Sequence, residues 1–126
     1  MKISSIILAA GQGTRMVSRL PKVLHRLNGK ELVLYSLEAA QASGSEKDVI
    51  VVSSDADALR SLVGERADYA IQQEQLGTAH AVLAAESHLK GKTDLVLVIH
   101  ADMPLLTAET LSNLVKAQSQ NSGPMT

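Results

Sequence analysis

The residues best suited to chemistry in this chain begin with a glycine-containing loop, Leu8-Ala9-Ala10-Gly11-Gln12-Gly13-Thr14-Arg15-Met16. Small residues let a backbone approach a ligand, and glycines permit turns that point several N–H groups inward. Arg15 adds a forked donor that matches phosphate oxygens. The loop therefore predicts an anion-binding nest.

The spacing of this loop excludes two common nucleotide motifs. A dinucleotide fingerprint starting at Gly11 needs glycine at its sixth position, which is Met16, and a P-loop needs a Gly-Lys-Ser/Thr ending that is absent. Taken alone, the Gly-x-Gly turn is equally compatible with a tight connection between a strand and a helix.

Three further groups could serve the same ligand, and each has a simpler explanation. Lys22 after Pro21 could offset charge as a phosphoanhydride reacts, although a lone lysine is usually solvated. Gln72 could bind a base through its amide, or be a polar residue at a strand end. Asp102 follows an apolar run and suits Mg²⁺, but could cap a turn before Pro104.

Four apolar runs predict the strands that position these residues: Ile3–Ala9, Asp48–Val52, Tyr69–Ile71 and Asp94–Ile99. The first, second and fourth are nearly continuous, which is typical of parallel strands covered on both faces.

Helices are predicted between the strands. The first covers residues 31–43, buries Val33, Leu37 and Ala40, and ends at Gly44; the second is capped by Ser54 or Asp55 and buries Leu59, Leu62 and Val63. The third is Ala79–Leu89, capped by Thr78, with Val82, Ala85 and Leu89 on one face. The last is capped by Thr107 and has Leu111, Leu114 and Val115 inward. This alternation predicts an α/β fold with a doubly wound, mostly parallel sheet.

Composition narrows the class of function. The 126 residues fit one domain, and 45% of them are apolar. A net charge of −1 and an absence of Phe and Trp argue against nucleic-acid or membrane partners. There is no Cys, so thiolate metal sites are excluded, and the four His show no ligand spacing. We expect a cytoplasmic, soluble protein.

Three blocks together resemble the signature of the sugar-1-phosphate nucleotidyltransferases. They are Leu8-Ala9-Ala10-Gly11-x-Gly13-Thr14-Arg15-Met16 with Pro21-Lys22-Val23-Leu24-His25 and Asn28-Gly29-Lys30; Gln72-Gln73-Glu74-Gln75-Leu76-Gly77-Thr78-Ala79-His80-Ala81; and Asp102-Met103-Pro104-Leu105-Leu106. The second block resembles the N-acetylglucosamine-1-phosphate uridyltransferase branch. The resemblance runs from about residue 6 to residue 106 and implies a Rossmann-like nucleotidyltransferase fold.

The resemblance implies a reaction in which N-acetylglucosamine 1-phosphate attacks the α-phosphorus of UTP. The products would be pyrophosphate and UDP-N-acetylglucosamine, a peptidoglycan and cell-envelope precursor, with Mg²⁺ bridging the phosphates.

It also implies a role for each matching residue. Leu8, Ala9, Ala10 and Gly11 would line the nucleotide pocket; Gly13, Thr14 and Arg15 would wrap the triphosphate, with Arg15 catalytic; Lys22 would contact the phosphates and take part in catalysis; Gln72, Gly77 and Thr78 would recognise uracil; Asp102 would ligate the metal. His25 and His80 would be neighbours of the site, and His88 a residue of a helix surface.

The chain departs from the family pattern in two respects. The last strand ends in His100-Ala101-Asp102, where the family usually has glycine before the aspartate, so Ala101 adds a methyl group near the ligand. The family's sugar-binding residues, second metal ligand and β-helical acetyltransferase domain lie beyond Thr126. We therefore expect residues 1–126 to be the nucleotide-binding N-terminal part of a truncated domain, without turnover of its own. A homo-oligomer is expected only for a full-length protein.

Two alternatives stay open from the sequence. The chain could belong to a nucleotidyltransferase for another sugar 1-phosphate, or it could be a non-catalytic UTP-binding module.

Overall fold

Four parallel strands form the centre of the fold in the computed structural model, which describes residues 1–10, 22–74 and 76–126. The strands are β1 (Ile3–Leu8), β4 (Lys47–Val52), β5 (Asp68–Ile71) and β6 (Leu95–His100), side by side in the order β5-β4-β1-β6. All four predicted strands are confirmed within one or two residues at each end, and so is the α/β class.

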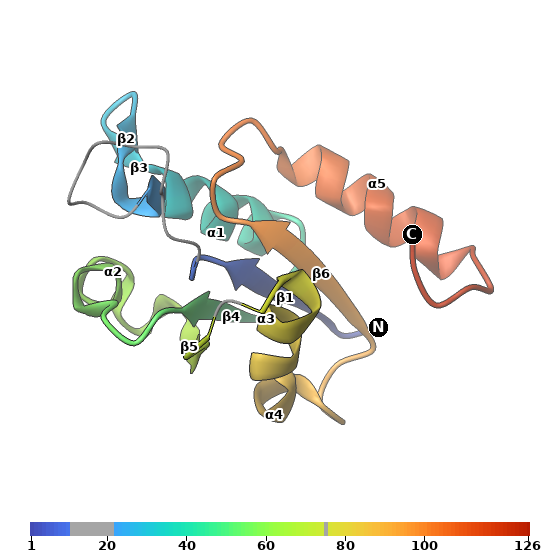
Figure 1. Cartoon of the computed structure of the whole chain (residues 1–126). Coiled ribbons are helices and arrows are strands. Elements are labelled where there is room, and N and C mark those ends of the chain that lie inside the picture. The colour runs from blue at the N-terminus through green and yellow to red at the C-terminus, as the bar shows by residue number, and fades with distance from the viewer. Residues whose placement is uncertain (11–21, 75) are drawn as a thin grey trace.

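Helices cover both faces of this sheet, as Figure 1 shows. One face carries α1 (Leu32–Ala42), α2 (Asp57–Val63) and α5 (Ala108–Ser119), and the other carries α3 (Thr78–Ala84) and α4 (Glu86–Leu89). Short 3₁₀ turns, η1 (Lys22–Leu24) and η2 (Gly64–Arg66), complete the helical elements of the described part of the chain. None of the helices described is long and apolar enough to cross a membrane.

The core is aliphatic because both faces of the central strands meet helices. Val49, Ile50, Val51 and Val52 in β4 have no exposed surface, as the continuous apolar run predicted. Even-numbered Ile50 and Val52 pack with α1 and α2, and odd-numbered Val49 and Val51 pack with α3 and α4. This alternation follows from the two-residue period of a strand.

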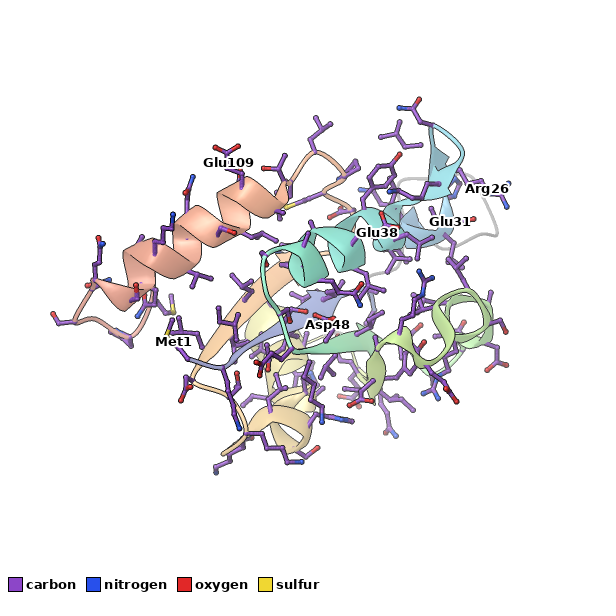
Figure 2. The ribbon with its side chains drawn as sticks, turned by 180° about the vertical axis from the view of Figure 1, so that it is seen from behind. Met1, Arg26, Glu31, Glu38, Asp48 and Glu109 are labelled. Carbon is purple, nitrogen blue, oxygen red and sulfur yellow. The ribbon has the colours of Figure 1, made fainter. Side chains whose placement is uncertain are left out.

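A two-stranded hairpin, β2 (Arg26–Leu27) and β3 (Lys30–Glu31), joins η1 to α1 and was not predicted. Its turn residues Asn28 and Gly29 have φ values of 53° and 80°, and the Asn-Gly pair is the usual sequence signal for such a turn. Figure 2 labels Arg26 and Glu31, whose side chains are 2.9 Å apart. A hydrogen bond from the Glu31 backbone amide, helped by Arg26, lowers the pKa of Glu31.

The strands at the two edges of the described sheet are less buried than β4, and β6 is also less buried than its sequence predicted. In β6, Val96 and Val98 are 42% and 46% exposed, whereas Leu97 and Ile99 are buried against α1 and α5. β6 lies at the edge of the described sheet, beyond the reach of α3 and α4, so one of its faces is uncovered. In β5, the opposite edge strand, Ala70 is the buried residue.

Helix ends also differ from the sequence expectations. The cap of α2 is Ala56 rather than Ser54 or Asp55, and Gly77 rather than Thr78 caps α3. The predicted helix 79–89 is divided at Ala85 into α3 and α4. For α5, the predicted cap is confirmed, because Thr107 accepts a hydrogen bond from Thr110 N. The predicted burial of Leu114 is wrong, because this residue is 41% exposed.

Candidate functional site

The order of the strands makes the carboxyl edge of the sheet the place where a ligand is expected. The chain runs outward from β1 to β4 and β5 on one side, and then returns to the other side of β1 as β6. The β1–β4 connection packs α1 on one face, while the β5–β6 connection packs α3 and α4 on the other. Open α/β sheets bind ligands where the connections diverge in this way, here beyond the ends of β1 and β6.

Three backbone hydrogen bonds continue the parallel pairing one residue past the strands. Ala9 N donates to Val51 O at 2.9 Å, and Ala101 N donates to Leu8 O at 3.1 Å. Gln72 N donates to Val52 O at 2.8 Å. The residues that follow β1, β5 and β6 are therefore held at one edge of the sheet, and three separate blocks of the sequence meet there.

Small buried residues follow the end of β1 at this edge of the sheet. Ala9 and Ala10 are 7% and 5% exposed, and Leu8 is partly buried. Ala9 belongs to the apolar cluster under α1, whereas Ala10 belongs to the cluster that contains Ala81 of α3. The predicted nucleotide-lining residues Leu8, Ala9 and Ala10 thus pass between the two helical layers.

Lys22 and Asp102, 80 positions apart in the sequence, form an ion pair at the carboxyl edge of the sheet. Lys22 Nζ lies 3.1 Å from Asp102 Oδ2, with the two side chains 46% and 39% exposed. Val23 and Leu24, which follow Lys22, are buried in the same cluster as Ala9 and Ala101, and they fix η1 against the sheet. A cation and a carboxylate are thereby both presented to solvent above the strand ends.

Gln72 occupies a buried corner between β5 and α3. It is 5% exposed, and its Nε2 lies 3.0 Å from His80 Nδ1 and 3.4 Å from Gly77 O. Gly77 has a φ of 105°, and Gly77 O also accepts the hydrogen bond from Ala81 N that opens α3. Thr78, the first residue of α3, is exposed beside this corner. Gln72, Gly77 and Thr78 are thus neighbours, as a shared role requires.

Ala101 has a different position from the one that its sequence suggested. It is fully buried and belongs to the cluster that contains Ile7 and Val23. Its methyl group therefore fills space in the core rather than space above the strand ends.

Two residues that contact this edge of the sheet were not among the site residues predicted from the sequence. Ser36 Oγ of α1 donates to His100 O at 3.2 Å and holds the end of β6 beside Asp102. No sequence signal marks Ser36, because a serine inside a helix usually faces solvent. His80 was expected only as a neighbour, and its contact with Gln72 becomes visible only in the fold.

The remaining predicted residues, Gly11, Gly13, Thr14 and Arg15, lie outside the described residues. Among the residues that are described, no three His, Cys, Asp or Glu side chains gather to hold a metal ion. Asp102 supplies one carboxylate. That donor set fits Mg²⁺, which is commonly bound by one or two carboxylates together with waters and substrate phosphates.

Comparison with known proteins places these features in a wider group. Residues 5–125 match the model of the MobA-like NTP transferase domain. The bifunctional protein GlmU of Halalkalibacterium halodurans is 46% identical over 122 residues, which are 97% of this chain and 27% of that protein. GlmU of Enterococcus faecalis is 51% identical over 110 residues, 87% of this chain and 24% of that protein. The chain thus spans about a quarter of the length of these relatives.

Solved structures share the fold at low sequence identity. Rv0371c from Mycobacterium tuberculosis H37Rv superposes with a TM-score of 0.82 at 18% identity, over 95% of this chain and 62% of that one. A nucleotidyl transferase from Methanothermobacter thermautotroptrophicus, Mth528, has a TM-score of 0.79 at 21% identity, over 91% of this chain and 57% of that one. The predicted Rossmann-like nucleotidyltransferase fold is confirmed.

Proposed function

Since the chain belongs to the MobA-like NTP transferase domain family, we propose that it forms the nucleotide-binding part of an N-acetylglucosamine-1-phosphate uridyltransferase. By homology to GlmU it is a nucleotidyltransferase domain. The observation that carries the proposal is the meeting of Ala9–Ala10, Gln72 and the Lys22–Asp102 pair at one edge of the sheet. This arrangement supports the proposal, because a nucleoside triphosphate needs a partner for its base, a backbone that it can approach closely, and a cation and a metal-binding carboxylate near its phosphates.

In the proposed reaction an oxygen of the sugar phosphate attacks the α-phosphorus of UTP. The new P–O bond forms as the bond from the α-phosphorus to the bridging oxygen breaks, and pyrophosphate leaves with the electron pair. Chemistry of this kind asks the protein to position the reactants and neutralise charge. A divalent cation, when bound, neutralises charge on the phosphate oxygens.

Each of the site residues predicted from the sequence has a part in this proposal. Gln72, Gly77 and Thr78 hold the uracil, and Leu8, Ala9, Ala10 and Gly11 line the pocket. Gly13, Thr14 and Arg15 wrap the triphosphate, Arg15 and Lys22 neutralise charge as the bonds change, and Asp102 is the metal ligand. Mg²⁺ is the proposed ion; a structure of Rv0371c in complex with manganese is an example of a divalent cation in this fold. Cytoplasmic synthesis of a cell-envelope precursor, without membrane or nucleic-acid partners, is the proposed setting.

The domain assignment is also a proposal. We propose that residues 1–126 bind the nucleotide, and that the sugar-binding part and any acetyltransferase β-helix belong to further sequence, as the length of the relatives suggests. The isolated chain should then bind UTP with Mg²⁺ without releasing pyrophosphate.

A chimera provides the decisive test. This chain replaces the matched 122 residues of the Halalkalibacterium halodurans GlmU protein, and pyrophosphate release is measured with UTP and N-acetylglucosamine 1-phosphate. We expect activity that Arg15→Ala abolishes. A folded chimera that is inactive with UTP but active with CTP, GTP or dTTP would show the base assignment to be wrong. Activity with another sugar 1-phosphate instead would favour the second candidate, and UTP binding without any turnover would favour a non-catalytic module.

A further inference from the structure

The corner that holds Gln72 restricts which part of its amide can face a ligand. The Gln72 backbone is fixed by its hydrogen bond to Val52 O, and the residue is 5% exposed, so its side chain has little freedom to rearrange. Buried polar groups almost always have hydrogen-bond partners, and the partners of Gln72 lie on α3 and at its N-terminal end.

The Gln72 Nε2 group has two N–H donors, and two possible acceptors within the chain lie within hydrogen-bond distance of it. One acceptor is His80 Nδ1, 3.0 Å away, and the other is Gly77 O, 3.4 Å away. With both N–H groups used in this way, the part of the amide left to contact a ligand is the carbonyl oxygen Oε1, which can only accept.

His80 makes the stronger of these two contacts. At 3.4 Å the contact with Gly77 O is at the long limit of a hydrogen bond, whereas 3.0 Å is an ordinary length. The hydrogen bond to His80 requires an unprotonated Nδ1, which means that a neutral His80 ring carries its proton on Nε2. The buried Ala81 next to His80 fixes this turn of α3 against the sheet, so the imidazole stays in place.

We propose that His80 is a positioning residue that sets the Gln72 amide so that Oε1 accepts a hydrogen bond from N3–H of a uracil base. Cytosine has an unprotonated N3 that cannot donate, so the same arrangement disfavours it. This inference rests on the proposed function, because it assigns base selectivity within that nucleotide site. His80 itself does not touch the base.

The test compares two substitutions of His80 in the full 126-residue chain. His80→Leu fills the site without an acceptor, whereas His80→Asn places Oδ1 near the former position of Nδ1. The dissociation constants of UTP and CTP are measured by calorimetry in Mg²⁺. We expect His80→Leu to reduce the preference for UTP over CTP by about tenfold, the size of one hydrogen bond in a buried site. His80→Asn should restore most of the preference.

A matched control is His88→Asn, which removes an imidazole from α4 near Asp68, at the amino end of the sheet. This variant should keep the preference of the unsubstituted chain. If the UTP/CTP ratio of His80→Leu is unchanged or increased in a chain that binds UTP, the role of His80 is wrong while the proposed function stands. If the unsubstituted chain binds no UTP, the proposed function fails and the inference fails with it.

A second measurement covers the case in which His80→Leu does not fold. Nitrogen-15 NMR of the unsubstituted, ligand-free chain reports which ring nitrogen of His80 is protonated. We expect a neutral ring protonated on Nε2, with Nδ1 as acceptor. A ring protonated on Nδ1 would require Gln72 to turn its oxygen toward His80, and that result overturns the inference without any variant.

Discussion

Lys22 Nζ, which follows β1, and Asp102 Oδ2, which follows β6, are 3.1 Å apart at the carboxyl edge of the sheet. The two residues come from η1 and from the turn after β6, and they meet because β6 returns to the side of β1. Each is close to half exposed. An ion pair so exposed contributes only about 0–1 kcal/mol to the free energy of unfolding, so its main role is not to stabilise the fold.

Removing either member of this pair should therefore lower the affinity for UTP while changing the free energy of unfolding very little. We expect Lys22→Met and Asp102→Asn each to change the free energy of unfolding by less than about 1 kcal/mol. The affinity for UTP in Mg²⁺ should fall about tenfold or more, because charged contacts to phosphate are lost. Urea unfolding and calorimetric titration measure the two quantities. The control pair is Lys90 and Glu86 on the other side of the molecule, whose variants should alter neither. Undiminished UTP affinity in both the Lys22 and the Asp102 variant would remove these two residues from the proposed site.

Gly77→Ala should destabilise the chain through the backbone alone. Gly77 has φ 105° and ψ 177°, a conformation that residues with a Cβ rarely adopt, although no atom lies within 4 Å of an added Cβ. We expect a loss of about 1–3 kcal/mol from this strain, with weaker UTP binding as Gln72 shifts. Gly123→Ala is the control, because its added Cβ meets only the Asn121 side chain at 3.4 Å. Thermal unfolding of the two variants side by side decides the point, and equal melting temperatures would contradict it.

Asp48 should matter for stability and not for the ligand. Figure 2 marks it in β4, and its carboxylate accepts hydrogen bonds from Ser5 at 2.5 Å and Ser45 at 2.7 Å. Asp48→Ala leaves both hydroxyls without this acceptor, at a cost of about 2 kcal/mol. UTP affinity should not change, since Asp48 lies near the amino end of β4, at the opposite edge of the sheet from the proposed site. Asp55→Ala, an exposed carboxylate bonded to Ser53, serves as control and should cost much less. A loss of UTP binding in folded Asp48→Ala would argue for a site elsewhere.

Alkaline pH should destabilise the chain through Tyr69. Burial raises the pKa of Tyr69 above 10.0, although Arg60 and Arg66 act in the opposite direction. Its hydroxyl donates to Gly64 O at 2.6 Å, which a phenolate cannot do. Because the folded state holds this proton more tightly than the unfolded state, the stabilisation is complete below the unfolded pKa and is lost as pH rises through the folded pKa.

The measurement is the free energy of unfolding as a function of pH from 9 upward, about where tyrosine begins to titrate. The unsubstituted chain should lose stability more steeply than Tyr69→Phe, which has no proton to lose. Tyr35→Phe removes the other tyrosine and should retain the steep dependence. Parallel curves for the unsubstituted chain and Tyr69→Phe would show that Tyr69 does not titrate in this way.

The sequence predicted the elements well where a local pattern reports directly on burial. The continuous run Asp48–Val52 predicted a strand covered on both faces, and β4 is such a strand. A similar run at Asp94–Ile99 predicted the same, but Val96 and Val98 are exposed because β6 lies at the edge of the described sheet. Both runs form strands, and only the neighbours of each strand decide how many of its faces are covered.

The N-terminal caps of the helices also show which features depend on local sequence and which depend on tertiary structure. Thr107 caps α5 as predicted, because its side chain needs only the backbone three residues ahead. Thr78 has a suitable side chain, yet the chain turns one residue earlier at Gly77, whose carbonyl serves both α3 and Gln72. The geometry of that corner depends on β5 and its neighbour β4, which no local pattern contains.

By itself, the sequence determined the residue types of the candidate site, the α/β class and the family of the chain. It could do so because small residues, an amide, a lysine and a carboxylate keep their chemistry wherever they are placed. The tertiary structure alone decided that Lys22 pairs with Asp102 and Gln72 with His80. The physical reason is that these contacts depend on strand order and on the path of α3. Both are set by how apolar faces pack together over the whole chain rather than by residues near the site.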